Sequence, residues 1–164
     1  MAPIKLVLDT NIVLDCVLRR EPFYQAARKL LVFGALGEYE MWVGSSQMSD
    51  LFYVLSDGGK KSRADECKSH CRALRKHVRV YPIGEAEVDA SINSNWLDIE
   101  DSLVHQAAVR LGATAIITRN KKDFMLSGVP VFDADEFFEW LSDARGISYE
   151  EIDLVGKGSA APAS

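Results

Sequence analysis

The sequence predicts an α/β fold with a central, mostly parallel sheet of four to five strands. Short apolar segments rich in β-branched residues alternate with longer segments whose apolar residues recur at helical spacing. Such alternation indicates βαβ units, which place strands parallel to one another under covering helices. Acidic residues also recur where predicted strands and helices meet, which is where open α/β sheets form their ligand crevice.

The length and composition indicate one globular domain. The chain has 164 residues, of which 48% are hydrophobic and 26% charged, both ordinary values for a folded domain. We expect the domain to occupy residues 1–155. The last segment, 156–164, reads GKGSAAPAS, lacks a core-forming pattern and is predicted to be a disordered tail.

Several features predict a cytoplasmic protein without a membrane segment. No apolar run approaches the roughly 20 residues of a membrane span, and the first residues show no secretory signal. Three cysteines, an odd number, suit a reducing compartment. The net charge of −5 disfavours nucleic-acid binding, but eight Lys or Arg residues against two acids lie between Lys60 and Arg79.

Apolar runs predict five strands, at residues 4–8, 41–44, 78–83, 113–118 and 129–132. The first is continuous, as in a buried strand. The third alternates polar Arg79 and Tyr81 with apolar neighbours. Pro130 places the fifth at an edge of the sheet, because proline cannot donate a ladder hydrogen bond.

The segments between these strands are predicted to be helices. They are a short helix through Leu14 and Leu18, a helix at 22–36, one capped by Ser45 or Ser46, a basic one at 62–77, a weak one at 85–92, a strong one at 98–111, and one opened by Asp133 or Asp135. Pro22 suits a first helical turn, and Gly37 and Gly112 suit helix ends.

Five aspartates stand at the predicted junctions: Asp9, Asp50, Asp98, Asp101 and Asp123. Carboxylates gathered at one end of a sheet repel one another unless a cation neutralises them. Hard divalent cations such as Mg²⁺ take oxygen ligands and meet their substrates through phosphates. The sequence therefore predicts a metal-dependent enzyme that acts on a phosphodiester.

Each acid also has an ordinary structural role. Asp9 could cap a helix, although Thr10 and Asn11 could do so equally well. Asp98 could be the cap of the helix that follows it, and Asp123 could pair with a neighbouring lysine. Glu100 is expected to point away from Asp98 and Asp101, which are three residues apart and share a helix face.

Four motifs in this order resemble the PIN domain, and the PilT N-terminus and VapC-like ribonucleases in particular. They are DTNI after the first strand, an acid in the helix after the second, DIEDSLVHQAA, and ITRNKKDF before the VPVF strand. The resemblance spans residues 4 to about 141. It implies a three-layer α/β/α fold and an acidic pocket that binds one or two Mg²⁺ or Mn²⁺ ions.

The resemblance also implies roles for residues. Asp9, Asp50 and Asp101 match the metal-binding acids, Asp98 is an added acid, and Asn120 or Asp123 serves the fourth position. Substrate contacts are expected from Asn11, Thr118, Arg119, Lys121 and Lys122. The second acid is commonly glutamate and the fourth commonly aspartate, so Asp50 and Asn120 depart from the pattern.

The expected activity is an endoribonuclease that hydrolyses RNA with a metal-activated water, as the toxin of a toxin–antitoxin pair. Its expected partners are an RNA substrate, an antitoxin protein and a second copy in a homodimer. The alternative is a weak or inactive PIN-like module that binds RNA or protein through residues 60–79, which otherwise form a solvated helix face.

Other chemistries fit less well. Cys67 and Cys71 supply half of a structural zinc site, with no second pair spaced to complete it. A haloacid-dehalogenase-like phosphatase needs an acid where this chain has Asn11, and a response-regulator receiver needs one at the end of the third strand. Neither GxGxxG nor GxxxxGK[ST] occurs, which disfavours a nucleotide-binding fold.

Overall fold

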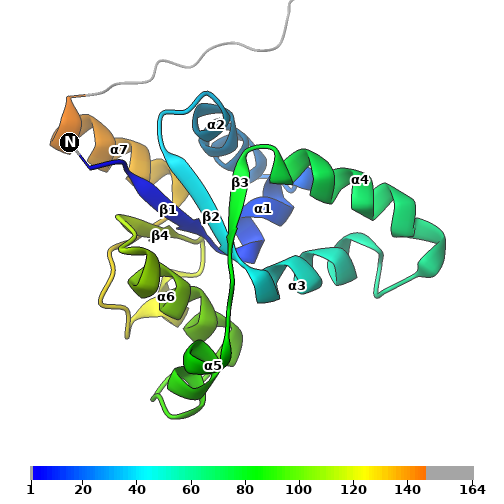
Figure 1. Ribbon diagram of the computed structural model, residues 1–164. Helices are drawn as coiled ribbons and strands as arrows, with labels where there is room; N and C mark the ends of the chain where they lie inside the picture. The colour runs from blue at the N-terminus through cyan, green and yellow to red at the C-terminus, as the bar shows by residue number, and fades with distance from the viewer. Residues whose placement is uncertain (1, 147–164) are drawn as a thin grey trace, which may run out of the picture.

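The chain folds around five parallel strands, as the computed structural model shows for residues 2–146 (Figure 1). The strands are β1 (Lys5–Leu8), β2 (Glu40–Gly44), β3 (Val78–Tyr81), β4 (Ala115–Ile117) and β5 (Val131–Phe132). Their order in the sheet is β3-β2-β1-β4-β5, and every neighbouring pair is parallel. The predicted α/β class and parallel sheet are confirmed, and β5 lies at an edge as its proline indicates.

Helices make every connection between the strands. They are α1 (Thr10–Val17) and α2 (Tyr24–Ala35) before β2, α3 (Ser45–Leu55), a 3₁₀ turn η1 (Lys61–Arg63) and α4 (Ala64–Arg75) before β3, α5 (Glu85–Ile92) and α6 (Ile99–Leu111) before β4, η2 (Lys121–Phe124) before β5, and α7 (Ala134–Arg145) after it. Within residues 2–146, no helix is long and apolar enough to cross a membrane.

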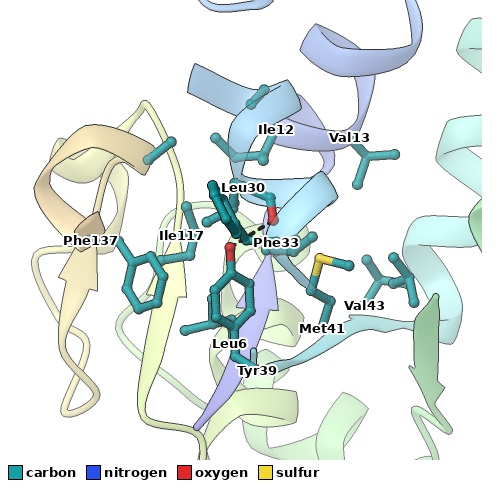
Figure 2. Close-up of a cluster of buried hydrophobic side chains, with 14 of the residues drawn as sticks. Leu6, Ile12, Val13, Leu30, Phe33, Tyr39, Met41, Val43, Ile117 and Phe137 are labelled. Carbon is teal, nitrogen blue, oxygen red and sulfur yellow. Dashed lines mark hydrogen bonds between the residues drawn. The ribbon is translucent and has the colours of Figure 1, made fainter. Parts of the chain in front are cut away.

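Two cores on opposite faces of the sheet make three layers. On one face, Leu6 and Leu8 of β1 pack with residues of α1, α2, α3 and α7. Figure 2 shows part of this cluster, in which the Tyr39 hydroxyl donates a hydrogen bond of 2.7 Å to the Leu30 carbonyl oxygen. On the other face, Val7 packs with α6 and η2. The alternation of side chains along β1 thus feeds both cores.

The basic helix lies less deeply in the molecule than expected. It begins at Ala64 after a 3₁₀ turn, and only Cys67 is buried, while Ala64, Cys71 and Leu74 are half-buried. Figure 1 explains this, because α3 and α4 extend together beyond the β3 edge of the sheet. Beyond that edge there is no strand surface for the inner face of α4 to cover.

Other boundaries differ by a few residues. The second helix begins at Tyr24, so Pro22 precedes it. The N-cap of α3 is Gly44, not Ser45 or Ser46, and Gln47 completes the cap by accepting from the Gly44 amide at 2.7 Å. Asp133 caps α7 as one of the two predicted candidates. The predicted tail at 156–164 and the end of the predicted domain lie outside the described residues.

The buried Gln47 side chain joins the start of α3 to the end of β1. Its amide nitrogen donates to the Leu8 carbonyl oxygen at 2.9 Å and to the Thr10 hydroxyl at 3.1 Å. Leu8 and Thr10 flank Asp9, so this amide fixes the position of α3 relative to that aspartate.

Candidate active site

Asp9 and Thr118 meet because β1 and β4 end side by side. Leu8 pairs with Ile117 in the parallel ladder, and each strand is followed directly by its polar residue. The Asp9 carboxylate is 8% exposed and accepts hydrogen bonds at Oδ2 from the Thr118 hydroxyl at 2.7 Å and the Asn11 amide at 2.6 Å. Asp9 occupies the N-cap position of α1 but makes no capping hydrogen bond. Its carboxylate is thus held at the carboxyl edge of the sheet.

Burial dominates the electrostatics of Asp9. It raises the pKa of the Asp9 carboxyl above its ordinary value, against hydrogen bonds from Thr118, the Thr10 amide and Asn11 and the charge of Arg119, all of which lower it. A buried carboxylate with a raised pKa gains more from a bound cation than a solvated one does, because less water already stabilises its charge.

Asp98 is the N-cap of α6, as its ordinary role predicts. Its Oδ1 accepts from the Glu100 amide at 2.7 Å and the Asp101 amide at 3.4 Å. The cap fixes the start of α6, and Asp101 lies in its first turn. A cap of this kind contributes about 1 kcal/mol to helix stability.

The pKa of Asp101 shows that several acids lie near one another. Burial and then the carboxylates of Asp98, Asp9, Asp123 and Glu100 raise its pKa to about 7. Four acids therefore act on one carboxyl group: Asp9 after β1, Asp98 and Glu100 at the start of α6, and Asp123 in η2. Asp50 is half-buried in α3, and burial raises its pKa as well.

Glu100 is exposed, as expected of a surface residue, yet its carboxyl lies within electrostatic reach of this group. Its side chain is exposed, but burial of the carboxyl and the charges of Asp50, Asp98 and Asp9 raise its pKa. The helical spacing rule does not separate it from Asp98, because Asp98 precedes the helix with extended backbone angles of φ −113° and ψ 123°. The charge of Asp50 also acts on Glu100.

The donors of this acidic group suit a hard divalent cation. All are carboxylate oxygens, the ligands that Mg²⁺ and Mn²⁺ prefer, and Asp101 shows that they carry uncompensated negative charge. In the part of the chain that the structure describes, no three acidic, histidine or cysteine side chains converge as a metal-binding cluster. The acids thus share an electrostatic field without meeting at one point.

The residues expected to contact substrate fall into three groups. Asn11 and the fully buried Thr118 face Asp9 and each other, with 3.3 Å between the Asn11 amide nitrogen and the Thr118 hydroxyl. Arg119 and Lys121 are engaged in ion pairs with Asp15 and Glu136. The remaining two predicted residues of this loop, Asn120 and Lys122, are exposed.

Sequence reasoning missed Asp15 and Phe23. Asp15 is fully buried in α1, where its Oδ2 accepts from the Arg119 Nε at 2.8 Å. The Arg119 guanidinium also lies 4.6 Å from the centre of the Phe23 ring. A signal existed in the run Ile12-Val13-Leu14-Asp15, where an acid directly follows residues of a buried helix face.

The raised pKa of Asp101 predicts how the stability of the protein changes with pH. This folded pKa of about 7 lies above the ordinary value of 3.8, so the native state binds the proton more tightly, and stability is lost as pH rises from about 4 to about 7. In EDTA at pH 8, Asp101→Asn should therefore melt higher than the parent protein. After discounting for solvent screening we expect a gain of about 1–2 kcal/mol, or roughly 3–8 °C.

The gain should disappear at pH 4, where the parent carboxyl is protonated too. The control is Glu139→Gln, which neutralises an exposed carboxylate in the middle of α7. Equal shifts in the two variants, or a lower melting temperature for Asp101→Asn at pH 8, would show that Asp101 is not under repulsion.

The chain is similar to several proteins of known sequence or structure. The sequence profile of the PIN domain matches residues 5–122. Ribonuclease VapC1 of Aquifex aeolicus (strain VF5) is 25% identical over 140 residues, which cover 82% of this chain and 94% of the relative.

Solved structures agree on the fold. VapBC2 of Rickettsia felis, bound to a DNA fragment from its promoter, superposes with a TM-score of 0.59 at 17% identity, covering 78% of this chain and 97% of that one. Mycobacterium tuberculosis VapC20, a sarcin–ricin loop cleaving toxin, gives a TM-score of 0.57 at 8% identity, covering 74% of this chain and 94% of that one. With most of the sheet and its acidic edge inside the profile match, the chain belongs to the PIN domain family.

Proposed function

We propose that this protein is an endoribonuclease that hydrolyses RNA phosphodiesters with the help of Mg²⁺ or Mn²⁺. The observation that carries the proposal is the buried Asp9 carboxylate beside a group of acids, in which burial first and then the neighbouring carboxylates raise the pKa of Asp101 to about 7. Such a site is costly without a cation and well suited to one. The relative named as a ribonuclease, which the chain matches over most of both lengths, supports the choice of RNA.

Asp9 and Asp101 are the proposed principal ligands, with Asp50 and Asp98 beside them. Once bound, the cation would lower the pKa of a water molecule and stabilise charge on the phosphoryl oxygens. Thr118 and Asn11 keep the Asp9 carboxylate in place through their hydrogen bonds. One oxygen of Asp98 is used by the helix cap, so its other oxygen is the one free to act on a ligand.

The attacking water forms a bond to phosphorus while the bond to the leaving O3′ oxygen breaks. The products are a 5′-phosphate and a 3′-hydroxyl, and O3′ takes up a proton. Asp123, whose charge acts on Asp101, is proposed to position this water. The exposed Asn120 and Lys122 are proposed to contact the phosphate backbone. A lysine at the rim contributes sequence-independent affinity, because it neutralises phosphate charge.

The biological setting is proposed to be a toxin–antitoxin pair in the cytoplasm. Structural neighbours such as VapBC2 were solved as complexes, and the Salmonella typhimurium VapBC structure is another, bound to DNA. By this likeness we propose an antitoxin partner and a homodimer. A protein that bound RNA without cleaving it would instead be the inactive PIN-like module.

The principal test is Asp9→Asn. We expect this variant to lose metal-dependent RNA cleavage by at least about 100-fold, because a ligand charge and the acceptor of two hydrogen bonds are changed together. The assay follows a fluorescent RNA in Mn²⁺, Mg²⁺ and EDTA, with Glu139→Gln as control and a melting curve for each variant. Cleavage that continues in EDTA, or products with a 2′,3′-cyclic phosphate, would contradict the proposed mechanism.

A second test concerns Glu100, which the structure adds to the acids. Glu100→Gln should lower cleavage several-fold, because its carboxylate contributes to the field at Asp50 and Asp9 that attracts the cation. The loss should shrink at saturating Mn²⁺, since the effect is on cation affinity. Full activity of Glu100→Gln at limiting Mn²⁺ would mean that Glu100 takes no part in the site.

A further inference from the structure

A buried ion pair ties α1 to the loop that follows β4. The Asp15 carboxylate has no exposed surface, and its Oδ2 accepts from the Arg119 Nε at 2.8 Å. Arg119 keeps 31% of its side chain exposed and packs its guanidinium 4.6 Å from the centre of the Phe23 ring. The pair spans 104 residues of sequence, so it fixes one element of the site against another.

The same loop holds the Asp9 carboxylate. Thr118 and Asn120 flank Arg119 in the sequence. The Thr118 hydroxyl donates to Asp9 at 2.7 Å and accepts from the Asn120 amide at 3.0 Å. The backbone amide of Arg119 donates to the Asn11 side-chain oxygen at 3.5 Å, and Asn11 donates to Asp9 at 2.6 Å. The guanidinium thus anchors a turn whose neighbouring groups orient Asp9.

Arg119 donates the side-chain hydrogen bond that the buried Asp15 carboxylate accepts. Its second oxygen, Oδ1, is buried without a hydrogen-bond partner, and the Arg20 Nη1 lies 3.9 Å from it. A buried carboxylate that loses its partner is strongly destabilised, whereas an apolar residue at such a position is often neutral or stabilising. The main role of the Asp15 carboxylate is therefore to orient the Arg119 side chain, and its contribution to the free energy of unfolding is secondary.

We infer that Asp15 and Arg119 are positioning residues. Asp15 holds the Arg119 guanidinium away from RNA, and the anchored loop allows Thr118 and Asn11 to fix the Asp9 carboxylate. This inference rests on the proposed ribonuclease function. The inference also gives the two cationic residues of this loop different roles. Arg119 stabilises the conformation of the loop, whereas the exposed Lys122 binds the substrate.

The experiment compares Asp15→Asn, Arg119→Gln and their double variant with Lys122→Gln. RNA binding is measured by anisotropy in EDTA over a range of salt concentrations, and cleavage in Mn²⁺ gives kcat and KM. Asp15→Asn and Arg119→Gln should each lower kcat by about 10- to 100-fold, since small misplacements of a reacting group have effects of this size. Their KM and their salt dependence of binding should match the parent protein.

Lys122→Gln should behave in the opposite way. Loss of one phosphate contact raises KM and reduces the slope of log affinity against log salt by about one. The double variant should be no worse than either single variant, because both remove the same interaction. A reduced slope for Arg119→Gln, or additive losses in the double variant, would overturn the inference by showing that Arg119 contacts RNA.

Backbone hydrogen exchange provides a readout that does not need cleavage. Asp15→Asn and Arg119→Gln should speed exchange of the Thr118 and Asn120 amides several-fold, and Lys122→Gln should not. If the parent protein cleaves no RNA, the proposed function fails while this result still decides the positioning role. Unchanged exchange in either single variant overturns that role. If Arg119→Gln does not fold because it leaves the buried Asp15 carboxylate unpaired, Asp15→Asn and the double variant carry the test.

Discussion

The site depends on the parallel pairing of β1 with β4, which brings Asp9 and Thr118 into hydrogen-bond contact. The pairing of Leu8 with Ile117 sets the register, and the Asp9 amide continues it by donating to the Ile117 carbonyl oxygen at 2.9 Å. A shift by one residue would turn each side chain to the other face of the sheet. The two central strands thus place a carboxylate and the hydroxyl that orients it before any other group of the site is considered.

Several carboxylates lie around this pair, and their mutual repulsion lowers the free energy of unfolding. Asp101 shows the consequence, since burial and four neighbouring carboxylates raise its pKa to about 7. Other interactions hold the acids near one another in spite of that repulsion: Gln47 fixes α3 to the end of β1, and the Asp15–Arg119 pair fixes the loop after β4. Their common effect is a site that a cation can complete.

The sequence allowed the sheet and most of the acids to be predicted, because both depend on local pattern. The apolar runs at β1 and β4 identify buried strands, and an aspartate directly after a strand lies at its carboxyl end. The electrostatic influence of the exposed Glu100 on this group was not predicted, because the helical spacing rule was extended to Asp98, a cap residue outside the helix. The Asp15–Arg119 pair was also missed, since no local pattern connects residues 104 apart. The shallow packing of α4 follows from its place beyond the sheet edge, which its amphipathic sequence does not encode.

The central proposal is a cation at Asp9, the buried carboxylate at the acidic edge of this PIN-domain sheet. The most direct test is a thermal melt with increasing Mn²⁺ at pH 7.5 and pH 5.5, for the parent protein and Asp9→Asn. Binding to the native state should raise the melting temperature of the parent by several degrees at pH 7.5. The rise should be smaller at pH 5.5, because protons compete for carboxyls such as Asp101, and it should be largely absent in Asp9→Asn. An equal rise in both proteins would place the cation elsewhere and contradict this account of the site.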